Sequence, residues 1–223
     1  VLFRSINDGS SDGTGRLIDA AFPGRSNVRR IHHDSPRGAA VAMQAGLDAA
    51  SGRWIGSCDA DDESIAEGVL SGLELAIGRS AEIVWMSLED VGVDGSRRVV
   101  TRSVPSAAVF PAESMFLGAW PALPASLISR ELLVRTGARV PDLSFGEDTI
   151  LALRALGGLQ SVEDIAVSSV VAYRYARRAG SLSDTSTTRP AAQVWPWMRL
   201  IRALVRESNR LVAEGRLRPS VVR

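Results

Sequence analysis

The chain has 223 residues, of which 45% are hydrophobic and 23% charged, a composition typical of a globular protein with a buried core. Its net charge of +1 argues against a dedicated nucleic-acid binder, because such proteins carry a marked basic surplus. The single cysteine, Cys58, excludes an intrachain disulfide and a cysteine-based zinc site. Cys58 ends an apolar run, so we expect it to be buried, and with no signal peptide visible we expect a cytoplasmic protein.

The chain opens inside a strand pattern, because VLFRSIN is apolar and β-branched and no other element precedes it. We therefore expect an N-terminally truncated fragment that lacks the first strand of its fold. A further hypothesis is that residues 1–5 are translated from a sequencing adapter.

Strand and helix patterns alternate over the first part of the chain. Apolar runs predict strands at residues 3–7, 27–33, 53–58 and 81–87, and helical spacing predicts helices at 16–22, 38–51 and 64–78. Ser64 is the predicted N-cap of the third helix. His32 and His33 end a strand without acidic neighbours, and we interpret both as structural. This alternation predicts βαβ units and a largely parallel sheet flanked by helices, an α/β fold.

The second half of the sequence is less regular. It predicts a hairpin at 88–100, a strand at 123–129, a helix at 130–137, a helix beginning at 146–148, strands within 162–176 and a long helix after residue 190. Asp94 and Gly95 form the turn of the hairpin.

Two polar clusters follow predicted strands, NDGSSDGT at residues 7–14 and DADD at residues 59–62. In a parallel sheet, ligands bind beyond the carboxyl ends of the strands. We therefore expect Asp8, Asp59 and Asp61 to lie near one another.

The DADD cluster offers carboxylates to a hard cation. Asp59 and Asp61 are one residue apart at a strand end, and oxygen ligands suit Mg²⁺ or Mn²⁺. Taken alone, the cluster is equally typical of an acidic first turn of the helix that follows. A haloacid-dehalogenase phosphatase also opens with D-x-D, but its pattern needs Thr or Val where Glu63 stands.

The first cluster also has the spacing of a calcium loop. Its candidate ligands would be Asp8, Ser10, Asp12, Gly13 and Asp19. A calcium loop needs a preceding helix and a long bidentate Glu at its end, whereas this chain has a strand pattern and Asp19. We therefore favour a nucleoside-binding turn.

A third acidic cluster, GED at residues 146–148, opens a predicted helix, where alone it would be an ordinary acidic cap. The order and spacing of NDGSSDGT, WIGSCDADD and GEDTILALRALG resemble the inverting glycosyltransferases of family 2. The resemblance runs from about residue 6 to 183, and it implies the nucleotide-diphospho-sugar transferase fold called GT-A.

The resemblance also implies roles for individual residues. It gives the catalytic base to Asp148 with Glu147 as its acidic neighbour, and the metal to Asp61. Asp59 would lie towards the ribose or a metal-bound water. It implies donor contacts, mainly to the nucleoside and diphosphate, for Asp8, Ser10, Arg37, Asp59 and Arg178, with Arg177 and Ser181 as weaker candidates. Between the first two motifs Gly38, Gly46 and Gly52 match the family pattern, whereas Ser35 and Met43–Gln44 depart from it.

The function implied is transfer of a sugar, with inversion, from a nucleotide-diphosphate donor to a saccharide or lipid-linked acceptor. A divalent cation, Mn²⁺ or Mg²⁺, would be the cofactor, and cell-envelope polysaccharide or glycolipid the product. Two alternatives from other classes are a non-catalytic nucleotide- or sugar-binding module and a calcium-binding protein. Transfer from a nucleotide sugar would separate the first, and calcium binding without nucleotide the second.

We expect a GT-A domain over residues 1–188 and a helical extension over 189–223. The extension carries an apolar stripe of Trp195, Trp197, Ile201, Leu204 and Leu211 with arginines beside it. We expect this stripe to pack against the enzyme and to be largely buried. The alternative is shallow contact with the inner face of a membrane.

Overall fold

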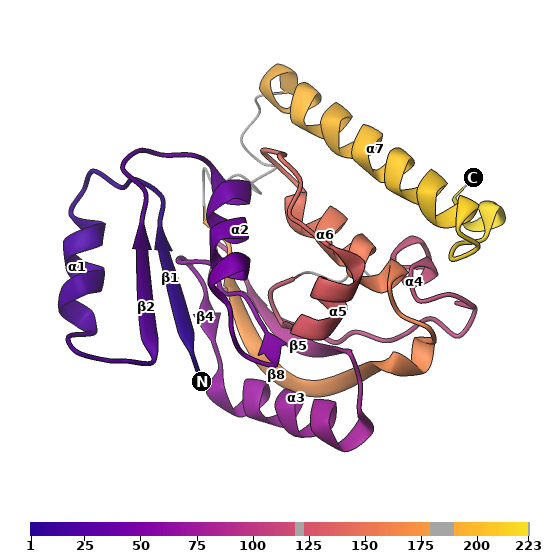
Figure 1. Cartoon of the computed structure of the whole chain (residues 1–223), viewed down its shortest axis with the longest axis horizontal. Helices are drawn as coiled ribbons and strands as arrows, with labels where there is room; N and C mark the ends of the chain where they lie inside the picture. Colours follow the sequence, from indigo (N-terminus) through magenta and orange to yellow (C-terminus); the bar gives the residue numbers. More distant parts are fainter. Residues whose placement is uncertain (119–122, 179–189, 223) are drawn as a thin grey trace.

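The computed structural model describes residues 1–118, 123–178 and 190–222 (Figure 1). The strands are β1 (Phe3–Asn7), β2 (Val28–His32), β3 (Trp54–Ile55), β4 (Glu63–Ser64), β5 (Ile83–Val91), β6 (Arg97–Val100), β7 (Ser126–Ser129) and β8 (Ile165–Ala176). The α-helices are α1 (Thr14–Ala21), α2 (Ala39–Ala49), α3 (Ala66–Arg79), α4 (Glu113–Phe116), α5 (Arg130–Thr136), α6 (Glu147–Gly157) and α7 (Pro190–Ala213). Short 3-10 helices are η1 (Val162–Asp164) and η2 (Pro219–Val221).

The strands form two separate sheets. β1 and β2 pair in parallel as a two-stranded sheet, and the larger sheet has the order β3-β7-β5-β8-β4, with β6 paired to β5. Within the described residues of the larger sheet only β5 and β8 pair in parallel, and the other pairs are antiparallel. The expectation of a largely parallel sheet is therefore wrong. Alternation of strands and helices predicts which elements exist, but β7 and the β5–β6 hairpin return in the opposite direction.

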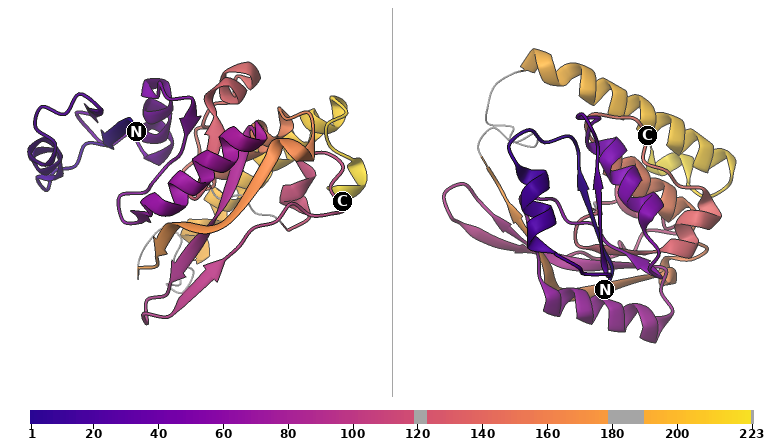
Figure 2. Two further views of the ribbon diagram at one scale, coloured as in Figure 1. Left: turned by 90° about the horizontal axis from the view of Figure 1, so that it is seen from below. Right: turned by 60° about the vertical axis from the view of Figure 1, so that its left-hand side comes forward.

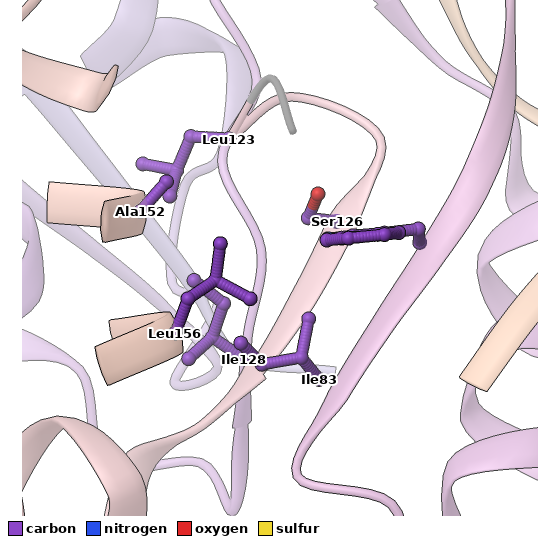
Figure 3. A pocket seen from close by; sticks show the side chains of 7 residues that line it. Ile83, Leu123, Ser126, Ile128, Ala152 and Leu156 are labelled. Carbon is purple, nitrogen blue, oxygen red and sulfur yellow. The ribbon is translucent and has the colours of Figure 1, made fainter. Parts of the chain in front are cut away.

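The larger sheet lies between two helical layers, with α3 on one side and α5 and α6 on the other (Figures 1 and 2). Alternation along β5 decides which side each residue faces. Ile83 and Trp85 join the core under α5 and α6, whereas Val84 and Met86 join the core under α3. A cavity of about 10 Å³ remains in the first core (Figure 3). It has room for about one water molecule and an apolar lining except for Ser126, so we interpret it as a packing gap.

The most deeply buried helix is α6, which lies between the sheet and α7. Its buried residues run from Thr149 to Gly157 with Arg154 as the exception. Covering α6 requires an apolar face on α7, and Leu200 and Leu211 supply it with 3% and 0% exposure. No helix within the described ranges combines the length and apolar character needed to span a membrane.

The predicted stripe of α7 divides into two faces. Leu204 and Leu211 pack into the core, as expected. Trp195, Trp197 and Ile201 are 65%, 46% and 53% exposed, so the prediction that the whole stripe is largely buried is wrong. Trp195 lies nearly opposite Leu211 on the helix, whereas Trp197 lies close to the inner face and its ring centroid is 4.8 Å from that of Phe145.

Further expectations concern a hairpin, a helix cap, the cysteine and a domain boundary. The hairpin is confirmed as β5–β6, with Leu88 opposite Val100. Ser64 is not an N-cap, because it belongs to β4 and α3 begins after Ile65. Cys58 is exposed rather than buried, since the strand before it ends early at Ile55. The proposed domain boundary at 188/189 lies outside the described residues.

Candidate functional site

An acidic loop joins β3 to β4 and presents three carboxylates to one point. Asp59, Asp61 and Asp62 each offer an oxygen, and these oxygens lie within 4.8 Å of one another. Asp59 and Asp61 match the sequence expectation. Asp62 was not singled out, although the same four-residue motif contains it.

Strand β8 holds this acidic loop in place. The Tyr173 hydroxyl donates to Asp62 Oδ2 at 2.6 Å, and the Ala176 amide donates to Asp62 Oδ1 at 2.8 Å. The amide of Asp59 donates to the Tyr173 hydroxyl at 3.2 Å. Tyr173 is only 2% exposed, so a rigid strand rather than solvent fixes the loop. The sequence gives no sign of this anchor.

Asp59 lies among other carboxylates. Partial desolvation and the nearby charges of Asp62, Asp61 and Asp148 raise the pKa of Asp59 to about 6, although the residue still reaches solvent. The contribution of Asp148 indicates that the GED turn lies within electrostatic range of the acidic loop. Asp61 forms an ion pair with Arg178, which follows β8.

The GED turn is held by packing. Gly146, the N-cap of α6, has φ of 72°, and a Cβ there would lie 2.6 Å from Leu200 Cδ2 of α7. Asp148 accepts a hydrogen bond from the Thr149 amide at 2.8 Å. Burial raises the pKa of Asp148. Burial and the charges of Asp148 and Asp59 raise the pKa of Glu147. Raised pKa values suit a carboxylate that takes up a proton near neutral pH.

The turn after β1 is held by contacts of its own, to residues 33–38. Gly9 has φ of 70°, and its position is so close to the backbone of Ser35 that a Cβ would lie 2.3 Å away. Asp8 accepts hydrogen bonds from His33 Nδ1 at 2.6 Å and from the Gly38 amide at 2.7 Å. The hydrogen bond from His33 is the main cause that lowers the pKa of Asp8.

The structural role expected of His33 has a partner in Asp8, 25 residues away, which its neighbours in sequence could not reveal. One sequence expectation fails at this turn. Asp8, Asp59 and Asp61 were expected at one sheet edge, but β1 and β3 belong to different sheets. Across the described residues, no hydrogen bond or ion pair connects Asp8 with Asp59 or Asp61.

The remaining predicted donor residues have the following places. Ser10 is exposed, and its amide donates to Asn7 Oδ1 at 3.3 Å. Arg37 is exposed, and its amide donates to Asp8 Oδ2 at 3.0 Å. Arg177 pairs with Asp90 on β5 at 2.7 Å, although its neighbours Ala176 and Arg178 both contact the acidic loop. Ser181 lies outside the described residues.

The calcium-loop alternative is wrong. A strand precedes the loop, and α1 begins at Thr14 inside it. Asp8 binds His33, and Asp12 accepts from the Thr14 hydroxyl at 2.6 Å. Within the described ranges, the group with metal-ligand geometry is Asp59, Asp61 and Asp62.

The acidic loop fits a hard divalent cation. All three of its candidate ligand atoms are carboxylate oxygens, the donors that Mg²⁺ and Mn²⁺ prefer. Asp62 is already oriented by β8. Desolvation and, after it, the charges of Asp62, Asp61 and Asp148 raise the pKa of Asp59, and a bound cation would offset the repulsion among these carboxylates.

Comparisons with known proteins agree with this arrangement. Residues 5–144 match the profile of glycosyl transferase family 2. The chain is 32% identical over 195 residues to the succinoglycan biosynthesis protein ExoO of Rhizobium meliloti (strain 1021), covering 80% of this chain and 53% of ExoO. It is 37% identical over 57 residues to the glycosyltransferase GlyG of Streptococcus pneumoniae serotype 4 (strain ATCC BAA-334 / TIGR4), covering 26% of this chain and 19% of GlyG.

The fold is also similar to solved structures. The S. aureus TarS 1-349 crystal structure in complex with UDP-GlcNAc has a TM-score of 0.69 at 16% identity, covering 92% of this chain and 57% of TarS. The complex of the same protein with UDP has a TM-score of 0.68 at 15% identity, covering 92% of this chain and 55% of TarS. The α/β GT-A-like fold is therefore confirmed. The chain spans about half the length of ExoO and of these TarS structures.

The family match has a defined extent. It includes the turn after β1 and the whole acidic loop, and it ends at residue 144, just before Glu147 and Asp148. The GED turn therefore lies outside the matched residues. Since the profile covers more than half of the chain, the chain belongs to glycosyl transferase family 2.

Proposed function

We propose that this protein is an inverting, metal-assisted glycosyltransferase whose acidic loop and GED turn form one active site. The observation that supports this most is that the charges of Asp148 and Asp59 act across the two regions, on the pKa of Asp59 and of Glu147 respectively, so a candidate cation site and a desolvated carboxylate lie within electrostatic range of each other. A cation can stabilise the departing diphosphate of a sugar-transfer reaction, and a carboxylate with raised proton affinity can take the proton of the acceptor. Asp61 and Asp59 are the proposed metal ligands.

The chemistry proposed for the chain's own residues is proton transfer and orientation. Asp148 accepts the proton of an acceptor hydroxyl while that oxygen forms a bond to the anomeric carbon of the donor sugar. The bond from that carbon to the diphosphate breaks, and its electron pair leaves with the diphosphate. Attack on the face opposite the leaving group inverts the anomeric configuration. Glu147 orients the acceptor or supports the turn.

The diphosphate is the part of the donor that needs positive charge. A bound Mn²⁺ or Mg²⁺ would supply Lewis-acid stabilisation of the charge that develops there. Arg178 exchanges its ion pair with Asp61 for contact with the diphosphate when the donor binds. This exchange is plausible in energy because the ion pair is exposed, and such pairs contribute about 0–1 kcal/mol.

The proposed donor is a nucleotide-diphosphate sugar, with the nucleoside near Asp8, Ser10 and Arg37. Support for a uridine nucleotide comes from TarS, whose structures contain UDP-GlcNAc and UDP. The proposed acceptor is a saccharide or a lipid-linked saccharide, and support for a role in polysaccharide synthesis comes from the name of ExoO. Residues 1–188 would be the catalytic domain and 189–223 a helical extension, in a protein that acts in the cytoplasm.

One screen tests this proposal. Uridine, guanosine and thymidine diphosphate sugars are incubated with the protein, with and without Mn²⁺, and release of nucleoside diphosphate is measured. We expect one nucleotide to be released in a Mn²⁺-dependent way. Binding of a nucleotide sugar without any release or transfer, also in a version extended to full length, would favour the non-catalytic binding module instead.

A further inference from the structure

The outer face of α7 carries an apolar stripe that no described element covers. Its members are spaced by four, three and four residues, so they form one line along the helix. They are Val194, Met198, Ile201 and Val205, with exposed fractions of 49%, 36%, 53% and 51%. Trp195 lies beside the stripe and is 65% exposed. A continuous apolar line on the surface is typical of an interaction site.

A groove rich in arginine adjoins this stripe. It has a volume of about 300 Å³ and lies between α7 and residues 141–143. Its charged lining residues are Arg154, Arg199, Arg202, Arg206, Asp142 and Glu207. Four arginines face two carboxylates, so the groove carries a surplus of positive charge.

Internal contacts neutralise only part of that charge. Arg154 pairs with the buried Glu207 at 3.4 Å, and Arg199 donates to the backbone carbonyl of Asp142 at 2.7 Å. Glu207 is shared with Arg210, which pairs with its other oxygen at 2.6 Å. Arg202 and Arg206 form no hydrogen bond or ion pair with any residue that the structure describes. These two guanidinium groups are therefore available for an external anion.

The groove and the stripe belong to one surface. Arg202 follows Ile201, and Arg206 follows Val205, so the free arginines lie along one side of the apolar line. α7 lies at the periphery of the molecule, with its inner face on α6 (Figure 1). Positive charge beside an exposed apolar stripe on one helix is the pattern of a helix that lies in a membrane interface.

We propose that the outer face of α7 docks on an anionic phospholipid membrane, with headgroup phosphates in the arginine groove and the stripe at the acyl boundary. A second copy of this chain would place arginine against arginine, which disfavours it as the occupant. A soluble phosphate would fill the groove and leave the stripe unexplained. Docking here would hold the active-site edge near the membrane, because Leu200 of the same helix contacts Gly146 of the GED turn.

Vesicle flotation of the 223-residue chain tests the charged half of the surface. We expect binding to vesicles that contain phosphatidylglycerol and little binding to phosphatidylcholine alone, with weakening by salt. Arg202→Gln with Arg206→Gln should weaken binding roughly 30-fold. The matched control is Arg25→Gln with Arg29→Gln, which removes two exposed arginines from the β1–β2 unit and should change binding less than about twofold.

The apolar half has its own pair of variants. Ile201→Ser with Val205→Ser should weaken binding to the same vesicles about tenfold. Its control, Leu17→Ser with Val99→Ser, removes side chains that are 71% and 55% exposed elsewhere and should bind like the wild type. Thermal melts check that each variant is folded, and all four positions of the two pairs are exposed, so folding should survive.

Three results would overturn the proposal. The first is absence of binding to anionic vesicles. The second is an equal loss of vesicle binding in the test and control variants. The third is a loss of binding in the arginine variant alone, together with displacement of the wild type from vesicles by inorganic phosphate. The last result would identify a site for a soluble phosphate. Release of nucleoside diphosphate in vesicle-free solution should be the same for all these variants, so a failure of docking is distinguishable from a failure of the proposed transfer reaction.

Discussion

The acidic loop between β3 and β4 and the GED turn before α6 are both rich in carboxylates, but the fold holds them by different means. The acidic loop is tied by hydrogen bonds to one strand, through Tyr173 and the Ala176 amide. The GED turn is held by packing, through Gly146 against Leu200 and a helix that is buried along most of its length. Hydrogen bonds orient ligand atoms and leave them in contact with solvent. Packing removes solvent from a carboxylate.

This difference matches the two tasks that the site needs. A metal site needs oriented oxygens, and a base needs a carboxylate whose affinity for a proton is raised by desolvation. Desolvation also raises the pKa of Asp59, so the orientation of Asp62 by β8 is what distinguishes the acidic loop. Burial raises the pKa of Asp148, which is the direction a base requires. If substitutions in the acidic loop and in the GED turn had the same effects on ligand binding and on the transfer rate, this division of tasks would be wrong.

The largest effect should come from removing the proposed base. Asp148→Asn keeps the size of the side chain and removes its basic oxygen, so transfer should slow by about 10²–10⁴-fold while Mn²⁺ and nucleotide bind normally. Single-turnover rates together with calorimetric binding measure both quantities. Glu147→Gln is the matched variant one residue away and should lose less. If Glu147→Gln is inactive while Asp148→Asn is active, the two roles are reversed. If both variants are active, the GED turn is not part of the active site.

Removing a proposed metal ligand should act on binding instead. Asp61→Ala should weaken Mn²⁺-dependent binding of uridine diphosphate by on the order of 100-fold, because it takes away a charged ligand. Asp61→Asn should be nearly as damaging, since the amide keeps the shape and loses the charge. Titration calorimetry with and without Mn²⁺ measures this, and unchanged metal-dependent affinity would exclude Asp61 from the site.

A smaller effect should follow from loosening the anchor of the acidic loop. Tyr173→Phe removes the hydroxyl that donates to Asp62, so the loop loses orientation but no ligand. We expect Mn²⁺ affinity to fall roughly tenfold. Tyr175→Phe, a hydroxyl removal two residues along β8, is the control and should bind Mn²⁺ like the wild type. If both variants melt at the same temperature and bind Mn²⁺ equally, the anchor does not position the metal ligands.

The smallest effect should be a dependence of metal binding on pH. The pKa of Asp59 is raised to about 6, so below that pH the carboxyl is mainly protonated and competes poorly for a cation. Mn²⁺ affinity of the nucleotide-free protein should therefore fall about twofold between pH 7 and pH 6, and more steeply below. Asp59→Asn should bind Mn²⁺ more weakly and lose this dependence. A wild-type profile that is flat down to pH 5 would show that Asp59 is not a ligand.

Much of the fold follows from local patterns in the sequence. Apolar runs mark β5 and β8, helical spacing marks α2 and α3, and the acidic GED cluster marks the start of α6. Direction and partnership of strands do not follow, because they depend on contacts between distant segments. The separation of the β1–β2 sheet and the antiparallel return of β7 are of this kind.

The candidate site shows the same division. Its carboxylates stand in motifs, so the sequence reveals Asp59, Asp61 and Asp148. The groups that position them do not, since Tyr173 is 111 residues from Asp62 and His33 is 25 residues from Asp8. The sequence also does not distinguish the inner face of α7 from its outer face. An apolar residue on a helix has the same appearance in sequence whether it covers α6 or faces outward.

One measurement tests the central claim most directly, namely that the two acidic regions divide metal binding and proton transfer between them. Binding of uridine diphosphate in the presence of Mn²⁺ is titrated for the wild type, Asp61→Asn and Asp148→Asn under the same conditions. The account predicts wild-type affinity for Asp148→Asn and a loss on the order of 100-fold for Asp61→Asn. Equal affinities for the two variants, whether both retained or both lost, would contradict it.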